Sequence, residues 1–296
     1  MLLLRFLCFI QNSITPLSLK RVGMKIIVIH HAKPYHLDDY LAVSLLLYKY
    51  KNQIERKEIK NPNEIDLENL KKQYDLIIFV DIGNRYEIND KIRFYDHHHN
   101  INIPCSLILI LKHEFPKLYE KVLKIEPIRK LIEYIDVRDR FGEAKAHSMF
   151  GICETFPLIR FLMSILMSEP NVVIGENFIN LIESYYKVYE TSKLYNIDDV
   201  KVVINYGDPR EVPVSVICDV FNPDMIIQKN VREPDKISVV KNQYSPLYDK
   251  INLEKLREIL PVTFIHPNKF MCVIAKSINE VNEEFVKKII LTSLSQ

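Results

Sequence analysis

Two unbroken apolar runs constrain the fold of this chain more than any other feature. Ile26 to Ile29 and Leu76 to Val80 contain no polar residue. A strand with one solvated face alternates polar and apolar residues, so a continuous run is typical of a parallel strand buried on both faces. A helix-like stretch through Leu41 to Leu46 lies between the two runs, and Ile92 to Tyr95 predicts a third, shorter strand. This β-α-β alternation predicts an α/β fold with a mostly parallel sheet flanked by helices.

The segments around these strands are expected to be largely helical. Asp38 or Asp39 is expected to cap the first helix, because a carboxylate accepts hydrogen bonds from free amides of a first turn. Leu107 to Leu123 and Ile128 to Ile135 also read as helical, as does most of the chain between Arg140 and Lys193. Lys49 to Lys60 is rich in charge and is expected to be a solvated helix end or loop.

Beyond Asp198 the pattern changes, which indicates a second, smaller α+β domain. Short β-rich runs follow one another there: Val200–Ile204, Val212–Cys218, Met225–Gln228, Val262–Ile265 and Met271–Ile274. A helix is expected from Asn282 onward. We therefore expect one domain over residues 24–192 and another over 198–296, with the boundary near Thr191 to Asp198.

Residues 1–23 are expected to be an extension outside both domains. The apolar run Leu2 to Ile10 is interrupted by Arg5 and is too short to span a bilayer, which takes ~20 residues. Because the first acidic residue is Asp38, a weak targeting segment is one interpretation. The favoured one is that translation starts at Met24, directly before the first strand. No other segment is long and apolar enough to be transmembrane, so a cytoplasmic protein is expected.

Composition excludes several classes of protein. The six glycines are scattered singly, whereas P-loops and dinucleotide-binding turns need clustered glycines. The five cysteines are odd in number and form no Cys-x-x-Cys pair, which argues against a disulfide framework or a zinc ribbon and for a reducing compartment. The formal net charge of +2 neither requires nor opposes binding to nucleic acid.

The candidate functional residues follow the predicted strands. Six of the nine histidines lie in two short segments, His30–Asp39 and Tyr95–Asn100, and Asp81 comes directly after the second apolar run. The carboxyl ends of parallel strands meet at one rim, and Asp136 and Asp139 join it if the helix from Ile128 ends there. Mixed His and Asp ligands bind Mn²⁺, Mg²⁺ or Zn²⁺, and a carboxylate can bridge two ions. Two ions ~3.5–4 Å apart can stabilise the entering and leaving oxygens of a phosphoryl displacement.

These segments resemble a known superfamily. Tyr95-Asp96-His97-His98 resembles the Asp-His-His signature of the DHH phosphoesterases. The pattern His31-x4-His36-x-Asp38-Asp39 resembles the first motif of one branch, the melanocyte proliferating gene family, described as metal-dependent phosphoesterases with 3′–5′ RNA exonuclease activity. Three further stretches resemble motifs of that branch and follow in family order, so that the resemblance extends from about Met24 to Ala275: Val80–Gly83, Glu133–Asp139 and Phe264–Phe270.

The resemblance implies a role for each residue. His31 and His36 would hold one metal ion, and Asp81 would bridge it to a second. The second ion would be held by Asp38, by His97 and by either Asp136 or Asp139. Asp96 would orient a neighbouring histidine. His98 would face the scissile phosphate and stabilise its charge or protonate the leaving oxygen. The implied cofactor is a pair of divalent ions, Mn²⁺ first and Mg²⁺ as the alternative.

The chain departs from the family on the substrate side. Cys272 and Val273 stand near the positions of a Gly-Gly pair in the family's second domain, and His31-Ala32-Lys33 replaces a His-Asn-Gly motif. The metal centre thus looks intact, while the substrate side is altered. His266 and Lys276 are candidates for holding phosphate or a strand terminus.

The favoured function is a two-metal exonuclease acting on single-stranded RNA or DNA, with no membrane partner. One alternative is a phosphoesterase for a small substrate, such as a short oligonucleotide, a cyclic dinucleotide or pyrophosphate. An alternative from another class is a catalytically silent scaffold that keeps the metal site. The oligomeric state and the choice among substrates are left open by the sequence.

Overall fold

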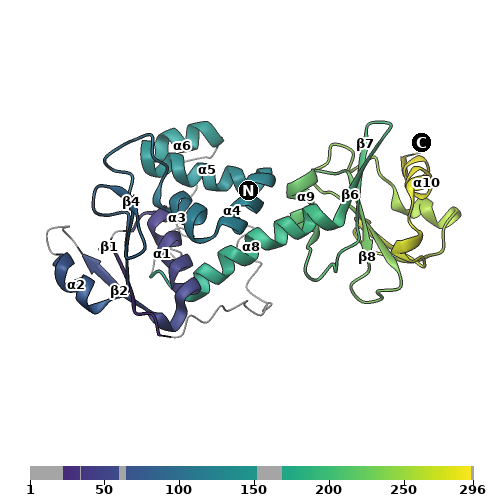
Figure 1. The fold of residues 1–296 in the computed structure, drawn as a ribbon. Helices are drawn as coiled ribbons and strands as arrows, with labels where there is room; N and C mark the ends of the chain where they lie inside the picture. The colour runs from purple at the N-terminus through teal and green to yellow at the C-terminus, as the bar shows by residue number, and fades with distance from the viewer. Residues whose placement is uncertain (1–22, 34, 60–64, 152–168, 295–296) are drawn as a thin grey trace. The chain divides into compact units, whose positions relative to one another are not determined.

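The computed structural model describes residues 23–33, 35–59, 65–151 and 169–294 and divides the chain into two compact units, Met1–Ile182 and Glu183–Gln296 (Figure 1). The division falls inside helix α8 (Val172–Thr191). Strand β6 (Ser192–Ile197) occupies the stretch near which the boundary is expected. The catalytic and substrate-binding roles of domains 24–192 and 198–296 stay predictions, and residues 1–22 of the predicted extension lie outside the described residues.

The first unit is built on a five-stranded sheet with the order β2-β1-β3-β5-β4. Its strands are β1 (Ile26–His31), β2 (Ile54–Ile59), β3 (Leu76–Val80), β4 (Tyr86–Ile88) and β5 (Ile92–Tyr95). Strands β2, β1, β3 and β5 pair with their neighbours in parallel. Strand β4 forms the edge of the sheet and pairs with β5 in the antiparallel direction. The predicted α/β fold with a mostly parallel sheet is confirmed.

Both faces of this sheet are covered, which explains the unbroken apolar runs. Ile26 and Val28 face one core together with side chains of α1 (Leu37–Tyr50) and α3 (Ser106–Glu114). Ile27 and Ile29 face a second core, against which α2 (Leu67–Gln73) packs. Each apolar side chain of β1 therefore has a core to enter, whichever face it points to.

Three local predictions in this unit are wrong. The helix expected over Leu107–Leu123 is two helices, α3 and α4 (Pro116–Lys124), because a proline disfavours the helical conformation of the residue before it. Asp38 and Asp39 do not cap α1 but lie in its first turn, behind the N-cap residue His36. The charged stretch Lys49–Lys60 contains strand β2, whose middle residues are exposed at the sheet edge.

Two further helices of this unit follow α4 along the chain: α5 (Glu126–Phe141) and α6 (Glu143–Phe150).

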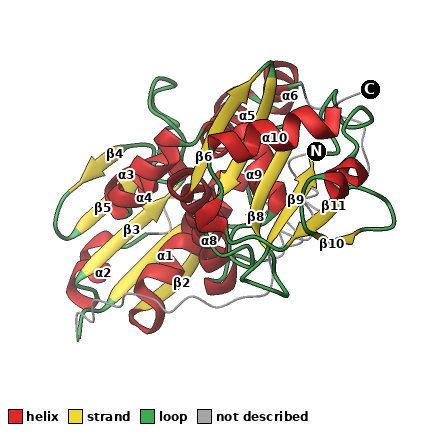
Figure 2. Ribbon diagram, turned by 90° about the vertical axis from the view of Figure 1, so that its right-hand side faces the viewer, coloured by secondary structure: helices red, strands yellow, loops and turns green. Residues whose placement is uncertain are grey.

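The second unit holds a six-stranded sheet with the order β10-β11-β9-β8-β7-β6. Its strands after β6 are β7 (Val200–Asn205), β8 (Met225–Lys229), β9 (Ile237–Lys241), β10 (Val262–Ile265) and β11 (Met271–Ile274). The pair β7–β8 is parallel and the others are antiparallel. Helix α10 (Glu283–Leu294) and the short 3₁₀ turns Leu253–Glu258 and Ile278–Glu280 pack on one face (Figure 2). This is the expected α+β part.

One β-rich run in this unit was wrongly predicted. Val212–Cys218 does not form a strand, because helix α9 (Val214–Phe221) begins there after Pro213. Parallel neighbours such as β7 and β8 require a crossover connection, and α9 supplies it. A short apolar run alone does not distinguish a buried helix from a strand.

Within the described ranges no helix combines the length and the apolar character needed to cross a membrane.

Candidate metal centre

Three neighbouring parallel strands deliver histidine and aspartate side chains to one edge of the first sheet. His31 is the last residue of β1, Asp81 follows β3, and the Asp96-His97-His98 segment follows β5. Strands β1, β3 and β5 lie next to one another in the sheet. Their carboxyl ends therefore meet, as the sequence predicted.

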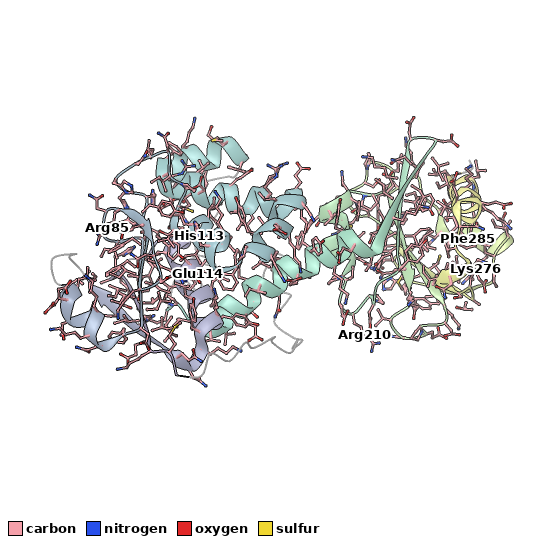
Figure 3. The ribbon with its side chains drawn as sticks, viewed as in Figure 1. Arg85, His113, Glu114, Arg210, Lys276 and Phe285 are labelled. Atoms are coloured by element: carbon pink, nitrogen blue, oxygen red, sulfur yellow. The ribbon has the colours of Figure 1, made fainter. Side chains whose placement is uncertain are left out.

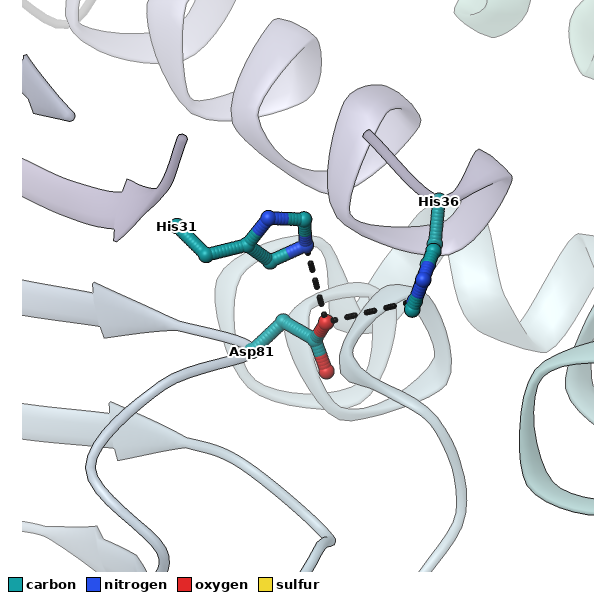
Figure 4. A group of neighbouring side chains, drawn as sticks. All are labelled: His31, His36 and Asp81. Carbon is teal, nitrogen blue, oxygen red and sulfur yellow. Dashed lines mark ion pairs between the residues drawn. The ribbon is translucent and has the colours of Figure 1, made fainter. Parts of the chain in front are cut away.

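Asp81 lies beside one pair of histidines through its Oδ2 atom. His31 Nε2 is 3.4 Å from Asp81 Oδ2, and His36 Nδ1 is 3.8 Å from the same oxygen. Figure 4 shows His31 and His36 reaching Asp81 from the end of β1 and from the start of α1. The three side chains form one of the groups that could hold a metal ion.

The other oxygen of Asp81 faces a second pair of histidines. His97 Nε2 is 3.5 Å and His98 Nδ1 is 3.7 Å from Asp81 Oδ1. His97 Nε2 is also 2.7 Å from Asp139 Oδ2, and Asp38, Asp81, His97 and Asp139 form a further group that could hold a metal ion. A carboxylate with one oxygen toward each group has the geometry of a bridging ligand.

The cluster holds buried polar atoms that form no well-aligned hydrogen bond within the described residues, although several lie at ion-pair distance from one another. They are His31 Nε2, Asp38 Oδ1, Asp39 Oδ1 and Oδ2, Asp81 Oδ2, His97 Nε2 and Asp139 Oδ2. Buried polar atoms whose hydrogen bonds are incomplete cost free energy, so they occur where another group completes them. The Nδ1 atom of His31 lies 2.8 Å from the Ala32 carbonyl oxygen, which can only accept, so Nε2 is left as the ligand nitrogen. These donors fit divalent cations.

The electrostatics of the cluster show an excess of negative charge. Burial lowers the pKa of His31, but the carboxylates of Asp39 and Asp81 outweigh it and raise that pKa to about 11. Burial likewise opposes the charge of His97, while Asp139 and Asp81 raise its pKa to about 10. Burial and the neighbouring carboxylates of Asp81 and Asp139 raise the pKa of Asp38. The site therefore favours added positive charge.

Helix α5 brings only one of its two candidate aspartates into the cluster. Asp139 Oδ1 lies 3.4 Å from His36 Nδ1, in addition to its contact with His97. Asp136 instead pairs with Arg140 and accepts a hydrogen bond of 2.8 Å from the backbone N–H of Cys105. The geometry thus places Asp139, and not Asp136, among the candidate ligands, while Asp136 fixes the loop before α3.

Asp96 and His98 form a separate pair at the rim of the cluster. Asp96 Oδ1 lies 2.7 Å from His98 Nδ1, and Asp96 Oδ2 accepts from the backbone N–H of Asn84 at 2.5 Å. His98 is half-exposed, and the contact with Asp96 raises its pKa despite partial burial. The contact with Asp96 occupies Nδ1, and His98 also belongs with Asp81 and His97 to a group that could hold a metal ion, so its predicted role at the phosphate stays a prediction.

Two side chains at the cluster were not assigned a role in the metal centre from the sequence. Asp39 is fully buried, and its Oδ2 atom lies 2.9 Å from His31 Nε2. Ser106 donates to the Tyr95 carbonyl oxygen at 2.8 Å, and its backbone N–H donates to Asp38 Oδ2 at 3.2 Å. Asp39 was visible in the first motif, whereas Ser106 carries no signal in the sequence, because its place depends on where α3 begins.

The two candidate substrate residues lie in the second unit. His266 Nδ1 accepts from the backbone N–H of Asn268 at 3.2 Å, and its ring packs on Phe270. Lys276 Nζ lies 3.0 Å from Glu280 Oε2. The substrate-binding roles of His266 and Lys276 stay predictions. Cys272 is buried in β11, where burial raises the pKa of its thiol to about 12.

Comparisons with known proteins give no family. No family model matches the chain, and no curated protein matches it either. Among solved structures, an uncharacterized protein from Helicobacter pylori G27 is 16% identical, with 90% of this chain and 99% of that chain covered and a TM-score of 0.26. RecJ in complex with Mn²⁺ from Thermus thermophilus is 13% identical over 90% of this chain and 51% of that chain, with a TM-score of 0.25. Likenesses of this size establish neither family nor activity.

Proposed function

We propose that this chain is a metal-dependent phosphodiesterase of the DHH type, a 3′–5′ exonuclease on single-stranded RNA or DNA that uses two Mn²⁺ ions, with Mg²⁺ as the alternative. The observation that carries the proposal is the position of Asp81. Its two oxygens face His31 and His36 on one side and His97 and His98 on the other. A single ion would not need a carboxylate divided between two sets of imidazoles.

The residues around Asp81 fit the chemistry of phosphodiester hydrolysis. His31, His36, Asp38, His97 and Asp139 would hold the ions together with Asp81. A divalent metal bound by these residues would supply an acidified water as the nucleophile and offset charge on the phosphate oxygens. Asp96 keeps the Nδ1 side of His98 occupied, so that His98 can deliver a proton from Nε2 to the leaving oxygen.

A phosphoesterase for a small substrate is the second candidate, and one observation favours it. The side chains of Cys272 and Val273 are buried in β11, near the positions where the resembled family carries a Gly-Gly pair. Glycine pairs allow close approach of backbone to substrate, and these two residues do not. A catalytically silent scaffold is the third candidate.

A reducing, cytoplasmic compartment is part of the proposal and rests on the spacing of the cysteines.

The test is hydrolysis of a substrate panel by the full chain in Mn²⁺, Mg²⁺ and EDTA. The panel holds end-labelled single-stranded RNA and DNA, a dinucleotide and pyrophosphate, and Asp81→Asn is the inactive control. We expect stepwise shortening from the 3′ end that requires metal and is lost in the variant. Cleavage of the small substrates alone would shift the function to the second candidate. Silence on the whole panel, with Mn²⁺ still bound by the wild type, would favour the scaffold.

A further inference from the structure

The second unit contains a cavity at the carboxyl ends of its two parallel strands. The cavity has a volume of about 150 Å³, and the residues that line it include Asp208, Arg210, Lys229 and Asn230. Its walls are the loop that leaves β7 and the loop that leaves β8. Crevices at the carboxyl ends of parallel strands are the usual ligand sites of α/β sheets. None of these four residues belongs to the metal centre.

The exposed guanidinium group of Arg210 contacts the carboxylate of Asp208. Asp208 Oδ1 accepts from the backbone N–H of Arg210 at 2.9 Å and from its Nε atom at 3.2 Å. Within the described residues neither Nη atom of Arg210 has a partner, and Lys229 Nζ has none either. Figure 3 shows Arg210 on a loop of the second unit. A guanidinium fixed through Nε presents its two Nη groups as a fork, the geometry that phosphate oxygens match.

Asparagine side chains fix the start of both loops. Asn230 Oδ1 accepts from the backbone N–H groups of Arg232 and Glu233, both at 2.9 Å, and its Nδ2 atom donates to Ser238 Oγ. Asn205 Oδ1 accepts from the backbone N–H of Gly207 at 2.9 Å. A Cβ atom at Gly207 would lie 2.8 Å from the Thr191 hydroxyl oxygen, so a larger residue there would displace the Thr191 side chain. The cavity walls are therefore ordered before any ligand arrives, which lowers the entropic cost of binding.

A row of polar side chains crosses the sheet at this end. Ser192, Asn205, Gln228 and Ser238 stand in register on four adjacent strands. Asn205 Nδ2, Gln228 Oε1 and Ser192 Oγ are buried without a partner in the described part of the chain. The next row on the same face is apolar and buried. It consists of Val203 and Ile226, two residues before Asn205 and Gln228, and of Val240, two residues after Ser238. Within this row, Asn205 and Ser238 hydrogen-bond to the two loops that form the cavity walls, so the polar end of the sheet supports those walls.

We propose that this cavity binds a phosphate group through the Nη atoms of Arg210 and the ammonium of Lys229. Arg210 and Lys229 supply two positive charges and Asp208 one negative charge, which leaves a net attraction for an anion. The phosphate can belong to a free ion or mononucleotide, or to the backbone of a nucleic acid strand. In the second case the site deepens the proposed function by adding an anchor for the strand in the second unit.

Calorimetric titration of the full chain in EDTA tests the proposal, because EDTA removes the metal ions that would also attract phosphate. The ligands are inorganic phosphate, a 5′-mononucleotide and a single-stranded oligonucleotide without terminal phosphates. Arg210→Gln and Lys229→Gln are compared with Arg257→Gln, which removes an exposed arginine outside the cavity. Each cavity variant should weaken binding by about tenfold, the value of one charge-assisted hydrogen bond, while Arg257→Gln should leave it within about twofold.

Each outcome bears on the proposal. If phosphate and the mononucleotide bind with this dependence, the ligand is a small phosphate; if the oligonucleotide does so, the ligand is the strand backbone. Wild-type affinity in both Arg210→Gln and Lys229→Gln, or no saturable binding of any of the three ligands, would overturn the proposal. Asp81→Asn should bind like the wild type in EDTA, so a failure of the hydrolysis test leaves this result independent.

Discussion

At the scale of single residues, Asp81 combines an unusual backbone conformation with the central position in the cluster. Its φ of 55° lies in the left-handed region, which residues other than glycine adopt only at a cost of ~1–3 kcal/mol. Aspartate and asparagine tolerate this region better than most residues. Directly after β3, this turn leaves the two carboxylate oxygens facing different histidines. Such local strain is typical of a functional position.

The two neighbouring histidines after β5 allow a matched test. His98 pairs with Asp96, whereas His99 is exposed and outside the groups that could hold a metal. We expect His98→Gln to lower kcat by about 10²–10⁴-fold, the usual contribution of a general acid. His99→Gln should change kcat by less than about twofold. Rates on end-labelled RNA, with Mn²⁺ affinity measured in parallel, check this; equal losses in both variants would contradict it.

Asp139 and Asp136 form a second matched pair. Asp139→Asn removes a candidate ligand beside His36 and His97, so Mn²⁺ affinity should fall by about 10–100-fold. Asp136→Asn weakens the contact with Arg140 instead and should lower stability while Mn²⁺ affinity stays close to that of the wild type. Calorimetry with Mn²⁺ and urea unfolding separate the two effects. The reverse pattern would assign the ligand to Asp136.

At the scale of elements, a buried carboxylate ties helix α3 to helix α1 and strand β5. Glu114, labelled in Figure 3, accepts from Lys49 Nζ at 2.5 Å, from the Tyr50 hydroxyl at 2.8 Å and from the Tyr95 hydroxyl at 2.6 Å, and it pairs with Arg93. Burial alone would raise the pKa of Glu114, but the positive charges of Lys49 and Arg93 and these hydrogen bonds lower it to about 2. The contact fixes the strand that leads into Asp96.

This carboxylate should make the first unit sensitive to acid. A pKa lowered by folding contributes stability that is present above the unfolded value near 4.5 and is lost as the pH falls toward 2. Glu114→Gln should lower the free energy of unfolding by about 3 kcal/mol at pH 7, because Lys49 and Arg93 lose their counter-charge. The difference from wild type should shrink between pH 4.5 and pH 2. Urea unfolding measures this, with the exposed Glu120→Gln as the control; an effect that does not depend on pH would count against it.

At the scale of the whole molecule, the candidate ligands are distant in sequence and lie on or next to five different elements of the first unit: β1, α1, β3, β5 and α5. His31, Asp81, His97 and Asp139 become neighbours only when β1, β3, β5 and α5 are all in place. Ligands that come together only in the folded state couple metal binding to folding. None of the groups of described residues that could hold a metal ion includes a residue of the second unit.

Metal binding should therefore stabilise the first unit. At a Mn²⁺ concentration of one hundred times Kd, linkage predicts a gain of about 2.7 kcal/mol. Hydrogen exchange of the full chain should show added protection around residues 31–41, 81–84 and 96–106, with little change in residues 200–290. Asp81→Asn should show no gain. Equal protection in both units, or protection that persists in the variant, would contradict a metal site at this cluster.

Strands buried on both faces of a sheet could be predicted from the sequence. Elements whose conformation depends on pairing with other elements could not. The apolar runs of β1 and β3 predicted both strands, because no other arrangement buries such residues on two sides. Strand β2 was missed because its exposed middle residues carry charge and its pairing with β1 is its main support. Val212–Cys218 was assigned the wrong class, because the need for a crossover helix arises from the parallel pairing of β7 and β8.

The sequence by itself determined which residue types stand at the ends of the strands, and with them the candidate metal chemistry. That information is local, since the hydrophobic pattern and the positions of His31, Asp81 and His97 can be read along the chain. Only the tertiary structure decided that Asp139 enters the cluster while Asp136 pairs with Arg140, and that each oxygen of Asp81 faces a different pair of histidines. The reason is physical: a side chain's partners depend on contacts between elements distant in sequence, and no local pattern records them.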